Sequence, residues 1–413
     1  MNYLKKLGFL LLAAALLFSG MSFNLAASAS ELDSADSAKY EENVKKSNDM
    51  VFHFWDYYAD YEAEVFSSPT YFSGFHLNTD GTLLMYVTDD SKAVKATVFD
   101  ICESTDLSFQ TMKYSYSELV ALREELSKYS DLYNIKCTSL SLHSNKVIVY
   151  TNGDPAEVKA LIHSTFKGES LGIQSVDEMI EVEKYAPPET AMPDHSASAQ
   201  VSNIRGQNSI TPMTQVNETF YPGELSTLES NDTGTIGFCA TDSYGRKLLI
   251  THGHGHGQHE PTVTVGGHTL NVYPLGSFLT VDAAYIVLPL YDPDFYPVLT
   301  NRVNNTSTTI NTIAYDYLLE TYEGLPVQIF GQTSSFFITT IDYILNENGF
   351  WFLAVDTPYP QDGDSGGPVY MTGTQNNRLI GIVSSEYGDV IIWKMIREEY
   401  YNVTGFTLTP WVS

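Results

Sequence analysis

The sequence predicts a protein of two globular parts, a mixed α+β region followed by an all-β domain. The chain has 413 residues, more than one compact core usually holds, and 43% of them are hydrophobic. The apolar runs are rich in Tyr, Thr, Val and Ile and are interrupted by 28 Gly and 17 Pro, which favours β structure. Beyond a Pro- and Ser-rich stretch at residues 186–213, helical periodicity gives way to short strand-like runs.

The net charge of the chain argues against binding to nucleic acids or anionic membranes. The chain has 22 Lys and Arg against 50 Asp and Glu, a formal net charge of -28. Nucleic acids and anionic membranes attract basic surfaces, because phosphates must be neutralised. We therefore expect neither nucleic acid nor a membrane surface as a partner.

The N-terminus predicts export. Lys5 and Lys6 precede an apolar run from Leu7 to Phe18, and Ala27-Ser28-Ala29 supplies a small-residue cleavage site. A retained membrane anchor is the alternative, but the apolar run is short for a bilayer span. We expect residues 1–29 to be a signal peptide and the mature protein to be secreted.

The region before the linker contains helical and strand patterns. Residues Tyr114–Tyr129 have the spacing of a helix, with Leu119, Leu122 and Leu126 on one side. Ser139–Thr151 alternates as two strands around a turn. A capped helix is expected over Asp154–Phe166.

The region after the linker predicts a sandwich or closed barrels, because many short strands alternate with turn residues. One helix, at about Ile391–Tyr401, is expected near the end of the chain. The expected strands are Thr235–Thr241, Arg246–Thr251, Thr262–Val265, Ala283–Leu290, Val327–Phe330, Phe336–Ile344, Phe350–Val355 and Leu379–Ser384.

Cysteine usage is sparse. The chain has three cysteines, Cys102, Cys137 and Cys239, and they are too far apart in sequence to form a metal or redox motif. An exported protein with so few does not depend on a disulfide framework. Pairing of Cys102 with Cys137 stays open.

The segment Gly363-Asp364-Ser365-Gly366-Gly367-Pro368 carries the strongest chemical signal. A serine nucleophile must stand on a sharp turn, and glycines let backbone N–H groups converge on a developing oxyanion. We expect Ser365 to be the nucleophile and the amides of Gly363 and Ser365 to bind the oxyanion. The alternative is a Gly-rich turn whose aspartate caps a helix.

A serine nucleophile needs a histidine base and a carboxylate, and both occur upstream. A histidine segment, Thr251-His252-Gly253-His254-Gly255, comes first, and an acidic segment, Asp282-Ala283-Ala284-Tyr285-Ile286, comes second. With the hexapeptide they give the order His, Asp, Ser. A further segment, Gly381-Ile382-Val383-Ser384-Ser385-Glu386, follows downstream. This set resembles the chymotrypsin-like serine peptidases, especially the bacterial streptogrisin and α-lytic protease branch.

The resemblance covers about residues 220–413 and implies two antiparallel six-stranded β-barrels, trypsin-like, with a C-terminal helix. It implies His254 as the base and Asp282 as the residue that orients it. It also implies that Ser384, Ser385 and Glu386 bind the substrate backbone and wall the specificity pocket. Asp292 and Asp294 are the competing acids, but they lie in a Pro-rich loop.

Residues Leu142–Phe166 resemble the C-terminal part of propeptides of the same branch, which assist folding and then inhibit the enzyme. The implied organisation is a signal at 1–29, an α+β propeptide and linker at 30–205, and a protease domain at 206–413. Arg205–Gly206 is the expected maturation bond. An unrelated binding domain is the alternative for the N-terminal region.

The sequence departs from the family pattern near the nucleophile. Gly255 replaces the cysteine after the catalytic histidine, and Gln361 stands where the pocket disulfide is expected. Ile329 replaces an arginine that pairs with the aspartate of the hexapeptide. Asp364 therefore needs another partner, since a buried unpaired carboxylate is costly, and Arg302, Arg378 or a new N-terminus are the candidates.

The histidine cluster offers a metal-dependent alternative. His252, His254, His256 and His259 have the composition of a zinc site, but no second metal motif follows downstream. We therefore expect no metal and no cofactor, with His252 packed beside the base. A zinc hydrolase is the less favoured alternative.

The overall expectation is a secreted serine endopeptidase precursor, a monomer whose partners are protein or peptide substrates and its own propeptide. A non-catalytic peptide-binding protein is the alternative. No acidic residue is visible at Tyr359 and Pro360, and Glu386 replaces a glycine, so we expect small, apolar or basic side chains in the pocket.

Overall fold

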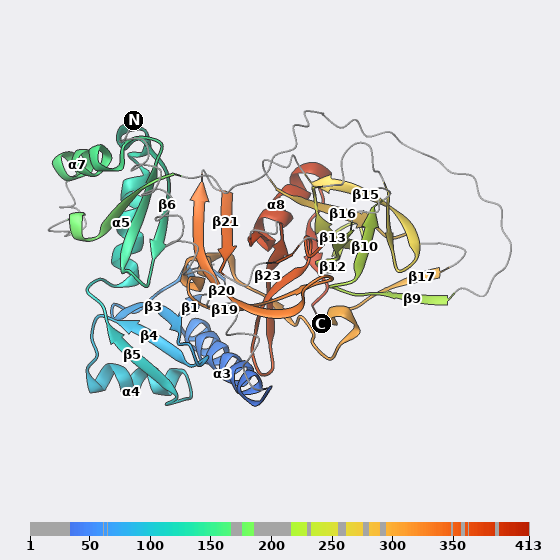
Figure 1. Ribbon diagram of the computed structural model, residues 1–413, viewed down its shortest axis with the longest axis horizontal. Coiled ribbons are helices and arrows are strands. Elements are labelled where there is room, and N and C mark those ends of the chain that lie inside the picture. Colours follow the sequence, from blue (N-terminus) through green and yellow to red (C-terminus); the bar gives the residue numbers. More distant parts are fainter. Residues whose placement is uncertain are drawn as a thin grey trace, which may run out of the picture.

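The computed structural model in Figure 1 describes most of the chain from residue 34 onward. The described residues are 34–60, 62–63, 65–166, 176–185, 216–228, 233–254, 262–275, 281–289, 295–347, 350–356, 360–361, 363–384 and 388–412. The expected signal peptide and the expected maturation bond Arg205–Gly206 lie outside these residues. None of the described helices has the length and apolar character needed to cross a membrane.

The N-terminal region begins with a long helix and a small sheet. Three strands pair in the order β3-β4-β5, with the α4 helix between the last two in sequence. The Ser91 hydroxyl caps α4 by accepting a hydrogen bond from the Val94 amide. The elements are α3 (Ser34–Tyr58), β1 (Ala59–Asp60), β2 (Val65–Phe66), β3 (Phe72–Leu77), β4 (Leu83–Val87), α4 (Lys92–Ile101) and β5 (Leu107–Thr111).

The rest of this region confirms the two predicted helices and the two predicted strands. The predicted helix is α5, whose three leucines are fully buried. The two predicted strands form the β6–β7 hairpin, and Asp154 caps the second predicted helix, α7. The elements are α5 (Tyr116–Ser127), α6 (Ser130–Tyr133), β6 (Ile135–Ser141), β7 (Lys146–Thr151), α7 (Pro155–Thr165), η2 (Val176–Glu178) and β8 (Ile180–Lys184).

After the linker the chain is mostly β. The first sheet has the strand order β11-β10-β14-β15-β16-β13-β12-β25, with antiparallel neighbours throughout. Its strands are β10 (Leu225–Leu228), β11 (Thr233–Thr235), β12 (Phe238–Asp242), β13 (Lys247–His252), β14 (Thr262–Val265), β15 (His268–Leu275), β16 (Ala283–Val287) and β25 (Leu408–Pro410). Two further strands, β9 (Val216–Phe220) and β17 (Phe295–Leu299), pair in parallel with each other.

The second sheet closes on itself. Its order β19-β22-β23-β24-β21-β20 is completed by pairing of β20 with β19, which gives a six-stranded antiparallel barrel. Its strands are β19 (Pro326–Gly331), β20 (Ser335–Glu347), β21 (Phe350–Val355), β22 (Pro368–Thr372), β23 (Asn377–Val383) and β24 (Asp389–Ile392). The remaining elements are η3 (Val303–Asn305), β18 (Thr312–Ile313), η4 (Asp316–Tyr322) and α8 (Trp393–Thr404). The predicted all-β domain with a C-terminal helix, preceded by an α+β region, is confirmed. Of the two expected six-stranded barrels, one is closed, whereas the described strands of the other form an open eight-stranded sheet, a half-barrel.

The two regions share one sheet. Thr138 on β6 is the register partner of Asn346 on β20, so the β6–β7 hairpin and β8 extend the barrel's long hairpin outward. Figure 1 shows β6 beside the orange strands β20 and β21. Strand addition of this kind joins the two regions through backbone hydrogen bonds, which depend little on side-chain identity.

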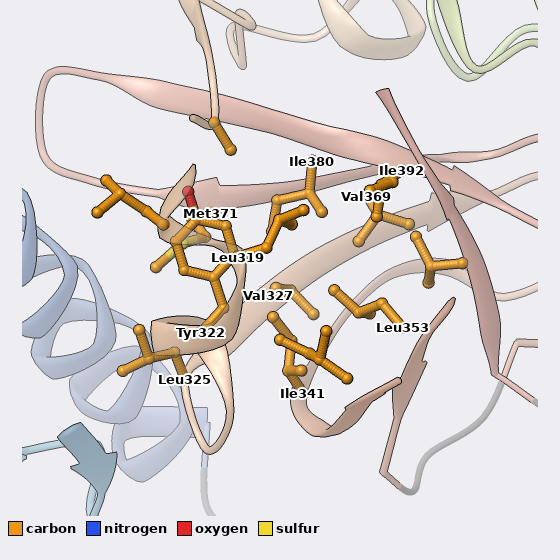
Figure 2. Packing of buried hydrophobic residues seen from close by; sticks show 14 of the residues in the cluster. Leu319, Tyr322, Leu325, Val327, Ile341, Leu353, Val369, Met371, Ile380 and Ile392 are labelled. Carbon is orange, nitrogen blue, oxygen red and sulfur yellow. The ribbon is translucent and has the colours of Figure 1, made fainter. Parts of the chain in front are cut away.

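Helix α3 makes a second contact with the barrel. Figure 2 shows the buried barrel core, including Tyr322, with the blue α3 helix alongside. The Trp55 ring lies 4.8 Å from the Tyr322 ring, and the Asp49 carboxylate accepts hydrogen bonds from the Thr374 amide at 3.0 and 3.1 Å. Helix α3 therefore contacts the barrel region through an aromatic pair and through hydrogen bonds of Asp49.

The three cysteines are all described and buried, and none of them forms a disulfide. The possible Cys102–Cys137 disulfide is therefore not present. Cys102 follows helix α4 and Cys137 lies on β6, and burial raises the pKa of the Cys102 thiol to about 12. The cysteines serve as small apolar core residues.

Candidate active site

The predicted nucleophile lies on a tight turn immediately before strand β22. Gly363 and Gly366 have φ angles of +92° and +89°, a region that L side chains rarely adopt. A Cβ atom on Gly366 would also lie 2.1 Å from the Thr235 carbonyl oxygen. The glycines of the hexapeptide thus allow the turn that leaves Ser365 at 9% exposure.

Asp364, beside the predicted nucleophile, is completely buried. One of its carboxylate oxygens accepts hydrogen bonds from the amides of Thr333 (2.8 Å) and Ser334 (3.0 Å). The other accepts one from the Gln361 amide at 2.8 Å. Gly331 makes room for the carboxylate, because a Cβ there would lie 2.0 Å from Asp364 Oδ1.

This arrangement corrects the expected partners of Asp364. The Arg302 guanidinium donates instead to the carbonyl of Thr306, and Arg378 pairs with Asp56 of α3 at 3.1 Å. Backbone amides supply the compensation that Arg302 or Arg378 was expected to supply. The third candidate, a new N-terminus after processing, lies outside the described residues. Hydrogen bonds to an ionised group are stronger than neutral ones, so three of them replace an ion pair.

The backbone around Ser365 presents two amides that can bind an anion. Within the described part of the chain, the amides of Gly363 and Ser365 donate no hydrogen bond, whereas the Asp364 amide donates to the Gln361 carbonyl at 2.9 Å. Two such amides on one turn form a binding site for a developing negative charge. They are the two amides named from the sequence.

The predicted base and acid meet at the end of strand β13. His254 Nδ1 lies 2.7 Å from Asp282 Oδ2, and Asp282 is 5% exposed. The other carboxylate oxygen accepts hydrogen bonds from the amides of Gly253 (3.0 Å) and His254 (2.6 Å). A carboxylate accepts, so His254 donates through Nδ1, which leaves Nε2 as the basic nitrogen of the neutral ring.

Ser384 contacts the predicted acid. The Ser384 hydroxyl donates to Asp282 Oδ2 at 2.6 Å. Because Ser384 follows strand β23 of the closed barrel, this contact links the barrel to the acid beside the other sheet. The sequence predicted a role for Ser384 in substrate binding but did not predict this contact. Ser385 and Glu386 lie outside the described residues.

His252 packs beside His254. The two imidazole rings lie 4.4 Å apart, centroid to centroid, and His252 is 3% exposed. His256 and His259, the other members of the possible zinc site, lie outside the described residues. Among the residues that are described, no three His, Cys, Asp or Glu side chains are grouped to hold a metal ion.

The turn at Ser365 and the strand that leads to His254 are joined through Thr235 of strand β11. The Thr235 amide donates to the Ser365 carbonyl at 2.8 Å, and its own carbonyl accepts from the Thr251 hydroxyl at 2.8 Å. Thr251 lies on strand β13, three residues before His254. Two buried hydrogen bonds therefore connect the predicted nucleophile with the strand that carries the predicted base.

No family model and no curated protein matches the chain. Among solved structures, the Nocardiopsis protease NAPase shares 18% identity over 46% of this chain and 99% of its own, with a TM-score of 0.33. The alpha-lytic protease homolog N4 shares 12% identity over the same fractions, also with a TM-score of 0.33. The inactive form of the protease Rv3671c of M. tuberculosis shares 15% identity over 44% of this chain and 90% of its own, with a TM-score of 0.26.

Proposed function

We propose that this protein is the precursor of a secreted serine endopeptidase of the chymotrypsin-like type. The observation that supports it best is the set of contacts at Asp282. Its carboxylate holds His254 through Nδ1, and it is itself held by two amides and the Ser384 hydroxyl. A carboxylate in this position fixes the tautomer and direction of a catalytic imidazole.

In the proposed mechanism, Ser365 Oγ attacks the carbonyl carbon of the scissile peptide bond while His254 Nε2 takes its proton. The carbonyl oxygen becomes an oxyanion and accepts hydrogen bonds from the amides of Gly363 and Ser365. The tetrahedral intermediate collapses, the C–N bond breaks, and His254 returns the proton to the leaving amine. A water molecule, deprotonated by His254, then hydrolyses the acyl-enzyme and restores the Ser365 hydroxyl.

The N-terminal region is proposed to be a propeptide that assists folding and inhibits the enzyme. Two contacts support this role: β6 extends the sheet through β20, and α3 packs on the closed barrel. Strand β19 pairs with β20 only over Ser335–Thr340, so the end of β20 near Asn346 projects beyond the closed barrel and β6 covers its open edge. A covered edge is protected from aggregation. The proposed maturation bond is Arg205–Gly206, and sequencing the N-terminus of the secreted form tests it; a start before Ala186 would refute it.

The proposed substrates are proteins or peptides with small, apolar or basic side chains before the scissile bond. Val383, which is buried on β23, has no group that would bind an acidic side chain, and Glu386 would attract a basic one. Profiling with a peptide library tests this preference. Strict cleavage after glutamate would refute it.

The serine mechanism is tested with an aryl fluorophosphonate probe that phosphonylates activated serines. We expect the wild type and the exposed control Ser127→Ala to be labelled and Ser365→Ala to be unlabelled. A wild type that folds normally but takes no label and cleaves no peptide would support the non-catalytic alternative. Loss of activity with a chelator, restored by zinc, would support the metal-dependent alternative.

A further inference from the structure

Thr235 makes two hydrogen bonds to the turn at Ser365. It is fully buried on strand β11, in the first sheet, whereas the turn precedes a strand of the closed barrel. Its hydroxyl donates to the Gly363 carbonyl at 2.9 Å, and its amide donates to the Ser365 carbonyl at 2.8 Å. The hydroxyl also accepts a hydrogen bond from the Gln332 amide at 3.2 Å.

These contacts act on the peptide groups that flank the two oxyanion donors. The Gly363 amide belongs to the peptide group between residues 362 and 363, and the Ser365 amide belongs to the peptide group between residues 364 and 365. The peptide group between Gly363 and Asp364 separates them, so its orientation sets the angle between the two donors. Its carbonyl is held by the Thr235 hydroxyl and its N–H by the Gln361 carbonyl.

Glycine makes this peptide group mobile unless it is held. Gly363 has a φ of +92° and lacks the Cβ that restricts rotation in other residues. Without the Thr235 hydroxyl, one of the two hydrogen bonds that fix the group is lost. The Gly363 carbonyl would then gain by rotating toward another donor, because an unpaired buried carbonyl is costly.

The same residue connects the turn to the base. The Thr235 carbonyl accepts from the hydroxyl of Thr251, on the strand that leads to His254. One residue therefore contacts both the turn and the strand that leads to the base. Preorganised donors accelerate a reaction only when they already point to where the charge develops.

We propose that Thr235 is a positioning residue that holds the amides of Gly363 and Ser365 in the arrangement that binds the oxyanion. This inference rests on the proposed serine mechanism and adds a residue to it. Thr235 acts through the turn and does not touch the substrate.

The variant Thr235→Val removes the hydroxyl with little change in shape, and Thr235→Ser retains it. A matched control is Thr321→Val, because Thr321 is also fully buried and its hydroxyl also donates to a backbone carbonyl, that of Leu318 at 2.7 Å. Thermal unfolding of the variants, measured in a Ser365→Ala background, separates lost stability from lost positioning.

Two ligands distinguish positioning from general damage: a peptide anilide substrate, and the matching peptide boronic acid, which forms a tetrahedral adduct with the serine. For Thr235→Val we expect kcat and boronate affinity to fall together by about 10- to 100-fold while KM changes less than about 3-fold. Thr235→Ser should recover most of the loss, and Thr321→Val should keep full activity. Equal kcat in Thr235→Val and Thr321→Val, or a loss confined to KM, would overturn the proposal.

Amide exchange gives a readout that does not depend on catalysis. In full-length Ser365→Ala protein, hydrogen–deuterium exchange at the Asp364 amide should be at least about tenfold faster with Thr235→Val than with Thr321→Val. Unchanged exchange would overturn the positioning role even if the enzyme is active. Faster exchange in a protein that takes no fluorophosphonate label would retain the structural role and reject the proposed function.

Discussion

The buried carboxylate of Asp364 gives the sharpest prediction about how the turn at Ser365 is built. The perturbation is Asp364→Asn, which keeps the size of the side chain but removes its charge. The amide oxygen can still accept from Thr333 and Ser334, whereas the NH2 group would face the Gln361 amide, a second donor. The substitution therefore weakens two hydrogen bonds and replaces the third with a repulsive contact.

The magnitude follows from these three contacts. A hydrogen bond to an ionised group is worth about 1.5–3 kcal/mol, and an orphaned buried donor costs about 1–3 kcal/mol. We expect Asp364→Asn to lower the free energy of unfolding by about 3 kcal/mol and Asp364→Ala, which orphans all three donors, by about 5 kcal/mol. For a domain of about 200 residues, the smaller loss lowers Tm by roughly 6–12 °C.

The assay is differential scanning calorimetry of the uncleaved chain in a Ser365→Ala background, which prevents self-digestion. The control is Asp106→Asn, an exposed aspartate in the N-terminal region, for which we expect a change within about 0.5 kcal/mol. Equal Tm values for Asp364→Asn and Asp106→Asn would refute the reasoning. If Asp364→Asn lowered Tm only in proteolytically processed protein, that result would instead support pairing of Asp364 with a new N-terminus.

Three further predictions concern the acid, the α3 contact and pH. Ser384→Ala removes one donor from Asp282 and should lower kcat/KM about tenfold in a peptide anilide assay; unchanged kinetics would show that the hydroxyl is dispensable. Asp56→Asn removes the carboxylate that pairs with Arg378, whose side chain is only 8% exposed. Because Asp56 itself is about half-exposed, we expect the free energy of unfolding in urea to fall by only about 1–2 kcal/mol. An unchanged free energy would show that the pair contributes nothing. Burial raises the pKa of Glu323 to about 8, so its contribution to stability is lost as pH rises from its ordinary value through 8. Wild-type protein should therefore lose up to about 1.4 kcal/mol per pH unit relative to Glu323→Gln between pH 5 and 8; parallel unfolding curves across this range would contradict it.

The elements that sequence predicted best are those set by local patterns. The helix Tyr116–Ser127 follows from three leucines at helical spacing, and strands Thr262–Val265 and Phe350–Val355 have the predicted bounds. The long helix α3 was not among the predicted elements, although the N-terminal region was expected to contain helices. Its first half consists mostly of polar and charged residues and shows little apolar periodicity, and its buried side chains contact both strand β3 and the distant barrel region.

The residues of the candidate site also differ in how well local sequence patterns predict them. Ser365, His254 and Asp282 were named from short motifs, and the structure brings His254 and Asp282 to 2.7 Å. The contact of Ser384 with the acid spans 102 residues and carries no local signal. No local pattern predicts the role of Thr235 either, because that role depends on the turn that its hydroxyl contacts and the strand that its carbonyl contacts.

The sequence by itself determined the residue types available for chemistry: a serine on a glycine turn, a histidine and an aspartate in a fixed order, and strand-forming runs around them. Only the tertiary structure decided how charges are compensated. Asp364 is held by backbone amides, and Arg378 pairs with a carboxylate 322 residues away. The physical reason is that nearly every residue carries a backbone amide, so the sequence cannot show which amides will converge. Long-range pairs likewise exist only after the strands and helices have packed.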